Sequence, residues 1–323
     1  MKILITGGAG FVGSNLAKYF VDKKYDVTIF DNFQRGNGNL KLLKDCNIKK
    51  GKLDDLPDLL SCSNFDLIYH FAAQVAVTSS YKDPQKDFNV NAKGTFSLLN
   101  AAGKTPVIYA STNKVYGDNV NHIPVIEYPK RYDFKGDINC KGISEDFPVD
   151  SRKHTPYGCS KLVGDIYTRE FGGVVNRFSC MYGTNQFGNE DQGWVAHFVI
   201  SKLLHNQLTV YGNGKQVRDL LFIDDVVNLL KIEAENIDAI RGEAFNIGGG
   251  YANTASVLEL CQRLEITPTF ADWRPADQKV YYSDIKKVER ILGWQPKVCI
   301  EEGLKKLSSW AEENKIILEN YHH

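Results

Sequence analysis

Short apolar runs alternate with stretches of helical spacing along the first half of the chain. Each run is rich in β-branched and aromatic residues and ends at a glycine or a polar residue, which is typical of a buried parallel strand. Strands are predicted at residues 3–6, 27–30, 67–71, 107–110 and 174–177, and helices at 12–22, 84–103 and 157–171. Strand–helix alternation of this kind predicts an α/β fold, a doubly wound parallel sheet with helices on both faces.

The pattern changes at two places. Residues 118–154 are polar and contain prolines, and they are expected to form a long loop outside the sheet, a lid or an interaction surface. Beyond about residue 178 the apolar runs become short and glycines and aromatics more frequent, which indicates a smaller mixed α/β domain. We therefore expect a nucleotide-binding domain over 1–178, rejoined by about 223–248, and a substrate domain over 179–222 and 249–323.

Three glycines separate the first predicted strand from the first helix. Gly7 permits a tight turn, Gly10 allows backbone to approach a pyrophosphate, and Gly13 allows close packing of the helix. The helix N-terminus adds amide donors for phosphate. Asp31 ends the next strand, where a carboxylate binds ribose hydroxyls and repels a 2′-phosphate. This arrangement predicts a dinucleotide site that prefers NAD to NADP, although Arg35, interpreted as a solvated loop residue, lies nearby.

Tyr157 and Lys161 are four residues apart, on one face of a predicted helix. Thr155 is a suitable cap and Pro156 a suitable first helical residue. A nearby ammonium is expected to lower the pKa of the phenol toward the range in which it acts as a base. Taken alone, the segment also fits an ordinary amphipathic helix with a surface lysine.

Hydroxyl side chains follow the strand at 107–110. Ser111 and Thr112 lie at its carboxyl end, beside the crevice where such sheets bind ligands. An isolated pair of this kind is also compatible with a polar strand ending. Together with the glycine loop and Tyr157, it indicates dehydrogenase-type chemistry.

Composition excludes several other classes. The 323 residues carry 39 Lys plus Arg and 39 Asp plus Glu, which gives no general field for nucleic acid or an anionic membrane. The seven cysteines form no CxxC pair, so we expect neither a disulfide framework nor a metal site. Without a signal peptide or a membrane-length apolar run, a cytoplasmic protein is expected.

These features resemble the extended short-chain dehydrogenase/reductases, in their nucleotide-sugar epimerase and dehydratase branch. The matching segments are TGGAGFVG at 6–13, HFAA at 70–73, NAKGT at 91–95, VYG at 115–117, YGCSK at 157–161, GNGKQVRD at 212–219, FNIGG at 245–249 and LGW at 292–294. The resemblance implies a Rossmann-type sheet, bound NAD, a nucleotide-sugar substrate and a homo-oligomer.

The resemblance also implies roles for particular residues. Thr112 takes the catalytic Ser/Thr position, Tyr157 is the base, and Lys161 holds the nicotinamide ribose. Implied cofactor contacts are Gly7, Gly10, Phe11, Val12, Gly13, Asp31, Asn32, Leu53, Phe71, Ala72, Ala73, Gln74, Tyr157 and Lys161. Implied substrate contacts are Gln74, Thr112, Asn113, Arg218 and Arg274, the two arginines on a diphosphate. Trp194 is a candidate for either the pocket or the core.

Two departures from the family pattern matter. Dehydratases of this branch carry acidic residues just after the catalytic threonine, whereas this chain has Asn113 and Lys114, which argues against 4,6-dehydration. Lys52 stands where relatives have an acidic residue at the adenine, so Leu53 is left to pack on the ring.

A narrower combination of segments is similar to the enzymes that invert C2 of CDP-linked hexoses. It comprises STNKVYG at 111–117, the 118–154 segment, TPYGCSK at 155–161 and DQGWV at 191–195. The similarity implies an NAD-dependent epimerase in the synthesis of bacterial surface polysaccharide. Two alternatives stay open: a 4-epimerase of a UDP- or GDP-sugar, and a non-catalytic NAD-binding regulator.

Overall fold

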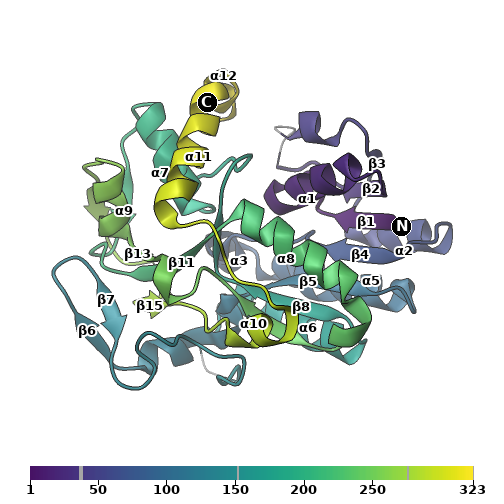
Figure 1. Ribbon diagram of the computed structural model, residues 1–323, viewed down its shortest axis with the longest axis horizontal. Helices are drawn as coiled ribbons and strands as arrows, with labels where there is room; N and C mark the ends of the chain where they lie inside the picture. The colour runs from purple at the N-terminus through teal and green to yellow at the C-terminus, as the bar shows by residue number, and fades with distance from the viewer. Residues whose placement is uncertain (36–38, 151–152, 275, 323) are drawn as a thin grey trace. The chain divides into compact units, whose positions relative to one another are not determined.

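The structure is a computed structural model that describes residues 1–35, 39–150, 153–274 and 276–322. The chain divides into two compact units, whose helices and strands are labelled in Figure 1. The first comprises Met1–Val115, Thr155–Arg177 and Val226–Phe245, and the second Tyr116–His154, Phe178–Asp225 and Asn246–His323.

The first unit is built on a seven-stranded sheet of order β12-β8-β5-β4-β1-β2-β3. The pairs β1–β2, β2–β3, β1–β4 and β4–β5 are parallel, and in this register Ile3 of β1 lies between Val27 of β2 and Leu67 of β4. The strands are β1 (Lys2–Thr6), β2 (Asp26–Asp31), β3 (Asn47–Lys50), β4 (Leu67–His70), β5 (Val107–Thr112), β8 (Val174–Phe178) and β12 (Ala244–Ile247). The five strands predicted from apolar runs are confirmed.

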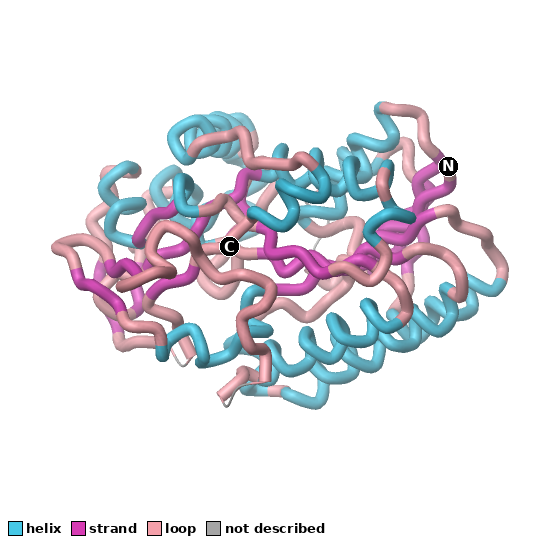
Figure 2. The backbone as a smooth tube through the Cα atoms, turned by 60° about the horizontal axis from the view of Figure 1, so that its bottom comes forward, coloured by secondary structure: helices cyan, strands magenta, loops and turns pink. Residues whose placement is uncertain are grey.

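Helices cover both faces of this sheet (Figure 2), because each face of a buried parallel sheet needs apolar cover. They are α1 (Phe11–Asp22), α2 (Leu56–Ser61), α3 (Val77–Lys82), α4 (Pro84–Phe88), α5 (Gly94–Ala102), α6 (Pro156–Glu170) and α8 (Ile223–Glu235). The helix predicted at 84–103 is divided, since a π-helical turn at Asn89–Lys93 joins α4 to α5. Such turns are frequent at functional sites.

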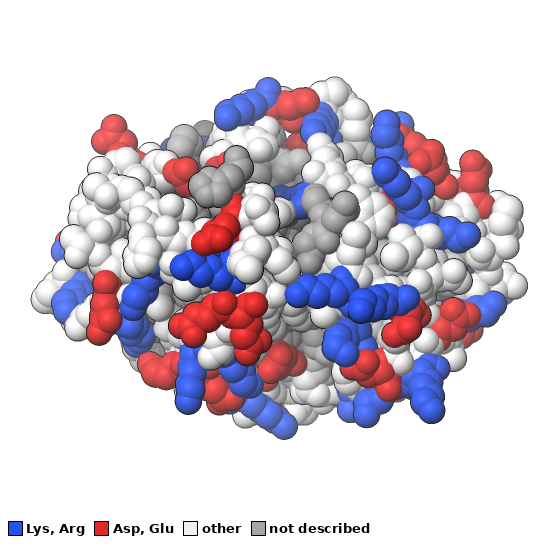
Figure 3. Space-filling view, turned by 90° about the horizontal axis from the view of Figure 1, so that it is seen from above, with Lys and Arg blue, Asp and Glu red and all other residues white. Residues whose placement is uncertain are grey.

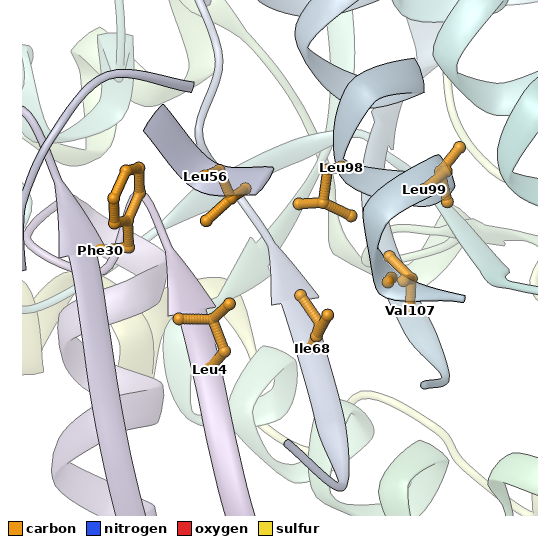
Figure 4. Close-up of a cluster of buried hydrophobic side chains, with 8 residues drawn as sticks. Leu4, Phe30, Leu56, Ile68, Leu98, Leu99 and Val107 are labelled. Carbon is orange, nitrogen blue, oxygen red and sulfur yellow. The ribbon is translucent and has the colours of Figure 1, made fainter. Parts of the chain in front are cut away.

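A cluster of buried side chains packs α2 and α5 onto the central strands (Figure 4). Each of β1, β2, β4 and β5 contributes one residue, and the helices close over them. The labelled members are Leu4, Phe30, Leu56, Ile68, Leu98, Leu99 and Val107. With the strand bodies packed in this way, the carboxyl ends of β1, β2, β4 and β5 remain for polar chemistry.

The second unit contains smaller, mixed sheets. The strand β11 (Val217–Phe222) pairs in parallel with β9 (Cys180–Tyr182) and β15 (Val280–Tyr281), and antiparallel with β13 (Thr254–Ser256). A parallel pair joins β10 (Thr209–Tyr211) to β14 (Thr269–Ala271). The helices are α7 (Trp194–Leu203), α9 (Val257–Arg263), α10 (Lys286–Leu292), α11 (Ile300–Glu313) and α12 (Lys315–His322). The prediction of an α/β protein with a Rossmann-type sheet and additional mixed structure is confirmed.

The segment expected to be a long loop has structure of its own. A 3₁₀ run at Asn113–His122 leads into an antiparallel hairpin of β6 (Val125–Glu127) and β7 (Tyr132–Phe134). The strands are only three residues each and are separated by polar residues, so no periodic apolar signal marks them. Tyr282 anchors the hairpin by donating a 3.0 Å hydrogen bond to the buried Asp133.

The charged side chains on the face seen in Figure 3 are interspersed, with both signs close together. This distribution agrees with the equal totals of acidic and basic residues. Within the part of the chain that the structure describes, none of the helices has both the length and the apolar character needed to cross a bilayer.

Candidate active site

The glycine turn between β1 and α1 is shaped by close backbone contacts. Gly7 has φ +66°, and a Cβ there would lie 2.6 Å from the amide nitrogen of Ala72. A Cβ at Gly13 would lie 2.6 Å from the Gly7 carbonyl oxygen, so Gly13 lets the first turn of α1 lie against the loop. At Gly10, the N-cap of α1, no side chain caps the helix. The first-turn amides, with Phe11 and Val12, are therefore presented as a cradle for an anion.

Asp31 ties this turn to the end of β2. The amide of Ala9 donates to Asp31 Oδ2 at 3.0 Å, and the amide of Phe33 donates to Oδ1 at 2.8 Å. Each carboxylate oxygen retains a second lone pair for a ribose hydroxyl. Asn32, next to it, accepts from the amide of Gln34 at 2.9 Å in an exposed position.

The end of β4 lies directly beside the glycine turn. The amide of Phe71 donates to the Thr6 carbonyl at 3.0 Å, and the amide of Ala72 donates to Thr6 Oγ1 at 3.3 Å. Phe71, Ala72 and Ala73 therefore border the same turn as Gly7. The structure thus brings together the implied cofactor residues from β1, β2 and β4.

Thr112 ends β5 in a buried position. Its hydroxyl donates to Asn113 Oδ1 at 3.3 Å and accepts from the amide of Lys114 at 3.3 Å. The neighbouring Ser111 points elsewhere: it donates to Asp165 Oδ2 at 2.9 Å. The two hydroxyls, which residue type alone does not distinguish, therefore have different surroundings: Ser111 contributes to the packing of α6 on β5.

Helix α6 begins as predicted, with Thr155 as N-cap accepting from the amide of Gly158 at 2.9 Å and Pro156 in the first turn. Gly158 has a role that sequence analysis missed. A Cβ there would lie 2.8 Å from the Lys114 carbonyl oxygen, so only glycine lets α6 approach the segment after β5 this closely. The approach brings Tyr157, 8% exposed, within hydrogen-bonding reach of Thr112.

The environment of Tyr157 differs from the sequence-based expectation. Burial raises the pKa of its phenol to about 12; the hydrogen bond from Thr112 lowers the pKa and Asp87 raises it, while Arg35 lowers it. The lowering of the Tyr157 pKa that we expected from Lys161 is not found, because the effect of burial dominates. Lys161 is itself buried, and burial lowers its pKa to about 7 although Asp165 and Asp87 favour the charged form.

Lys161 lies over the face of Tyr109, with Nζ 4.0 Å from the ring centroid. Gly164 leaves room for that ring, because a Cβ at this position would clash with the hydroxyl oxygen of Tyr109. A cation over a buried aromatic face is stabilised by the ring quadrupole. The lysine is thus held in the interior by an aromatic platform on β5.

A polar network next to the tyrosine and lysine was also missed. Gln74 donates through Nε2 to Asp87 Oδ1 at 2.9 Å, and its backbone exchanges two 2.9 Å hydrogen bonds with the side chain of Asn91. Asn91 reaches Ser160 Oγ at 3.1 Å, and Ser160 donates to Asp87 Oδ2. Asp87 and Asn91 are four apart on helical spacing, which is the signal that was available.

The remaining candidates do not take part in this network. Leu53 packs against the apolar cluster and against Gly94, where a Cβ would lie 2.7 Å from Leu53 Cδ1, and Lys52 is exposed. Arg218 and Arg274 belong to the second unit. Trp194, also there, donates to Cys180 Sγ at 3.3 Å and packs on Phe198.

Arg218 and Arg274 each have a carboxylate partner, Asp277 and Glu190 respectively. Arg218 donates to Asp277 Oδ1 at 2.6 Å. Arg274 donates to the Glu190 carbonyl at 3.0 Å and lies over Tyr211, with Cζ 3.9 Å from the ring centroid. Among the described residues, no group of three His, Cys, Asp or Glu is arranged to hold a metal ion.

The residues of the first unit fit a dinucleotide. A pyrophosphate requires amide donors and room for its oxygens, and it finds both at the uncapped start of α1, beside the space that side chains at Gly7 and Gly13 would fill. A ribose requires an acceptor for its hydroxyls, which is the carboxylate of Asp31. The fold and this turn together define a dinucleotide-binding α/β enzyme.

Comparison with known proteins is consistent with this class. Residues 3–248 match the model of the NAD dependent epimerase/dehydratase family, and the chain belongs to that family. It is 39% identical to CDP-paratose 2-epimerase of Salmonella typhi over 96% of this chain and 99% of that protein. The predicted family, an epimerase-type enzyme and NAD as its cofactor are confirmed.

Solved structures of nucleotide-sugar epimerases have the same fold as this chain. The UDP-glucose 4-epimerase of Thermotoga maritima, with UDP-glucose, has a TM-score of 0.82 at 27% identity, covering 98% of this chain and 100% of that chain. The UDP-glucuronic acid 4-epimerase of Bacillus cereus, in complex with UDP-glucuronic acid and NAD, has a TM-score of 0.79 at 28% identity, covering 97% and 99%.

Proposed function

We propose that this protein is an NAD-dependent nucleotide-sugar epimerase that inverts C2 of a CDP-hexose, of the CDP-paratose/CDP-tyvelose type. Two observations carry the proposal together. The buried Tyr157 lies next to Thr112, and the residue that follows Thr112 is Asn113 rather than a carboxylate. Such a site supports oxidation and reduction of a sugar carbon but lacks the acid/base pair that expels water. The likeness to CDP-paratose 2-epimerase supports the particular sugar and carbon.

In the proposed reaction Tyr157 takes the proton from the C2 hydroxyl while Thr112 hydrogen-bonds to the same oxygen. NAD, when bound, supplies the acceptor and then the donor of the C2 hydride. The 2-keto sugar turns over in the pocket and is reduced on its other face, and Tyr157 returns the proton to the oxygen. Atoms and electrons balance within one turnover, so no external reductant is consumed.

The protonation state of Tyr157 is decisive for this step. With a pKa of about 12 the phenol is neutral near pH 7; among the described residues, the hydrogen bond from Thr112 and the charge of Arg35 favour the phenolate. In the proposal, Lys161 also favours the phenolate when it is charged. Because burial lowers the pKa of Lys161 to about 7, the charge of this side chain depends on pH in the neutral range. In the proposal, Lys161 in its charged form also donates to the nicotinamide ribose.

We assign the diphosphate of the substrate to Arg218 and Arg274, which lie within the predicted substrate domain over 179–222 and 249–323. The planar fork of a guanidinium suits phosphate oxygens. Arg218 donates to Asp277 and Arg274 donates to Glu190. The assignment predicts that the diphosphate of the bound nucleotide replaces these carboxylates as the partner of the two guanidinium groups.

We also propose a homo-oligomer formed through α5 and α6. Phe96, Tyr167 and Phe171 are each more than two fifths exposed, yet they pack on one another with Phe96–Tyr167 and Phe96–Phe171 centroids 5.1 and 6.1 Å apart. A contiguous aromatic patch favours burial against a second copy. Sedimentation of Phe96→Ser, compared with wild type, tests it: dimers that persist unchanged would contradict this surface.

The function is tested with CDP-paratose, CDP-tyvelose and UDP-glucose as substrates, with NMR identification of the inverted carbon. We expect interconversion of the CDP-sugars at C2. Inversion of UDP-glucose at C4 would instead support the 4-epimerase alternative, which the likeness to the Thermotoga maritima enzyme favours. The C2 activity would place the enzyme in the cytoplasmic synthesis of sugars for lipopolysaccharide O-antigen.

Tyr157→Phe separates catalysis from mere NAD binding. It removes only the phenolic oxygen, so NAD should still bind while turnover falls at least about 100-fold, the usual contribution of a general acid/base. Undiminished turnover would remove Tyr157 from the reaction. Retained NAD binding without turnover of any sugar by wild type would support the regulator alternative.

A further inference from the structure

Asp87 is a fully buried carboxylate that the proposed chemistry does not use. It lies in α4, where it accepts hydrogen bonds from Ser160 Oγ, from Gln74 Nε2 at 2.9 Å and from Asn91 Nδ2 at 3.4 Å. All three donors are neutral. Because a buried charge is costly without an opposite charge, this carboxylate calls for a cation close by.

Lys161 provides that opposite charge. Its ammonium is buried over the neutral ring of Tyr109. The other carboxylate that favours its charged form, Asp165, is already neutralised by Arg177, which binds it through Nε at 2.9 Å and Nη2 at 3.1 Å. Asp87 is therefore the buried anion whose charge remains for Lys161.

Ser160 links the two. It precedes Lys161 in α6, donates to Asp87 and also to the carbonyl oxygen of Tyr157 at 3.0 Å. Its hydroxyl lies between the carboxylate on α4 and the helical turn that carries both functional side chains. The π-helical turn after α4 brings Asn91 to the same hydroxyl.

We propose that Asp87 is a positioning residue of the active site: through Ser160 it fixes the turn of α6 that carries Tyr157 and Lys161, and its charge keeps the buried Lys161 ammonium protonated. The proposal rests on the roles given to Tyr157 and Lys161 above. Asp87 itself touches neither sugar nor cofactor in this scheme.

Other ionisable groups cannot account for a change near neutral pH. Among the described residues, the groups that interact with Lys161 are Asp87 of α4, Asp165 of α6, His70 of β4 and the ring of Tyr109 on β5. Tyr157 lies one turn before Lys161 in α6. Burial lowers the pKa of His70 to about 3 and raises the pKa values of both tyrosines, so these groups stay neutral between about pH 6 and 9. Asp165 keeps its pairing with Arg177. Burial raises the pKa of Asp87, whereas its hydrogen bonds and the charge of Lys161 lower it, so the carboxylate and the ammonium favour each other's charged forms. The proposal assigns the change of charge near pH 7 to Lys161.

The first test titrates Lys161 directly. Lysine labelled with ¹³C at Cε is incorporated, and the resonance of Lys161 is assigned by its loss in Lys161→Met. We expect a midpoint near pH 7 in the wild-type protein, and a midpoint about one pH unit lower in Asp87→Asn, because removal of a nearby anion disfavours the ammonium. An unchanged midpoint in Asp87→Asn would overturn the proposal.

The matched control is Asp83→Ala. Asp83 is the exposed N-cap of the same helix and accepts from the amide of Lys86 at 2.9 Å, so its replacement by alanine removes the cap of α4 without removing the buried charge. We expect no shift of the Lys161 midpoint. An equal shift of the Lys161 midpoint in both variants would show that Asp87 acts only by stabilising α4, and would contradict a role for its charge.

If Asp87→Asn does not fold, Ser160→Ala takes its place. It removes the hydroxyl that favours the ionised form of Asp87, so the Lys161 midpoint should fall in the same direction by a smaller amount. A midpoint that stays at the wild-type value, or rises, would contradict the proposal.

The second test is the affinity for NAD between pH 5.5 and 9, measured by calorimetry without any sugar. Wild-type affinity should fall as the pH rises through about 7, and in Asp87→Asn the fall should begin about one pH unit lower. Affinities that do not depend on pH would overturn the link to Lys161. Because no sugar is used, failure of the C2 assignment leaves this result standing, and the two failures are distinguishable.

Discussion

Glu233 in α8 allows a quantitative prediction about the stability of the first unit. Its side chain is fully buried, and Oε2 accepts from Asn176 Nδ2 of β8 at 2.8 Å, while Glu233 Oε1 and Asn176 Oδ1 have no hydrogen-bond partner among the described residues. Burial raises the pKa of Glu233 from 4.5 to about 8, and the hydrogen bond from Asn176 only partly offsets this.

The sign follows from proton binding. Between pH 4.5 and about 8 the folded protein holds a proton that the unfolded chain has released, so the free energy of unfolding falls as the pH rises through this range. At 1.36 kcal/mol per unit of pKa, the loss amounts to about 3 kcal/mol at pH 7 and approaches about 5 kcal/mol above pH 8.

Glu233→Gln removes this loss because the amide cannot ionise, and it can donate to the unpartnered Asn176 Oδ1. We expect its stability advantage over wild type to grow by about 4 kcal/mol between pH 5 and pH 9. The assay is urea unfolding of the NAD-free protein, followed by far-UV circular dichroism at a series of pH values.

The control is Glu235→Gln on the same helix, whose exposed carboxylate pairs with Lys231 at 3.7 Å. Its effect should stay within about 0.5 kcal/mol at every pH, as is usual for surface substitutions. If the stabilities of wild type and Glu233→Gln ran parallel from pH 5 to 9, the inferred neutral state of Glu233 would be refuted.

Three further predictions concern the site. Asp31→Ala should weaken NAD binding relative to NADP, measured as the ratio of Kd values; an unchanged ratio would remove the carboxylate from the ribose. Gly158→Ala should lower kcat at least about tenfold with little loss of NAD affinity, since its Cβ would push α6 from the Lys114 carbonyl, 2.8 Å away; normal kcat would show that this approach is dispensable. Thr112→Val removes a hydrogen bond that lowers the pKa of Tyr157, so the limb of the pH–rate profile that reports the phenolate should move to higher pH; a limb that stays in place would disprove the coupling.

The fold was largely predictable because its signals are local. Runs such as Ile3–Thr6 and Val107–Ala110 are apolar at successive positions, as strands buried on both faces must be. The hairpin of β6 and β7 was not, since each strand has three residues and owes its position to contacts such as Tyr282–Asp133, 149 residues apart.

The electrostatics of the site could not be predicted from spacing. Tyr157 and Lys161 do share a face of α6, but the depth at which that face is buried reverses the expected shift in the tyrosine pKa. Likewise, Asp87 and Ser160 are 73 residues apart in sequence and meet only because α4 packs on α6.

The sequence by itself determined the order of strands and helices, the glycine turn with Asp31, and the presence of Thr112, Tyr157 and Lys161, because each depends on residue type and short-range spacing. Only the tertiary structure decided what surrounds each hydroxyl at the end of β5, which carboxylate remains for Lys161, and how strongly burial shifts the pKa values of Tyr157 and Lys161. Burial and electrostatic interaction depend on distances between segments that are far apart along the chain, and these distances exist only after the helices have packed on the sheet.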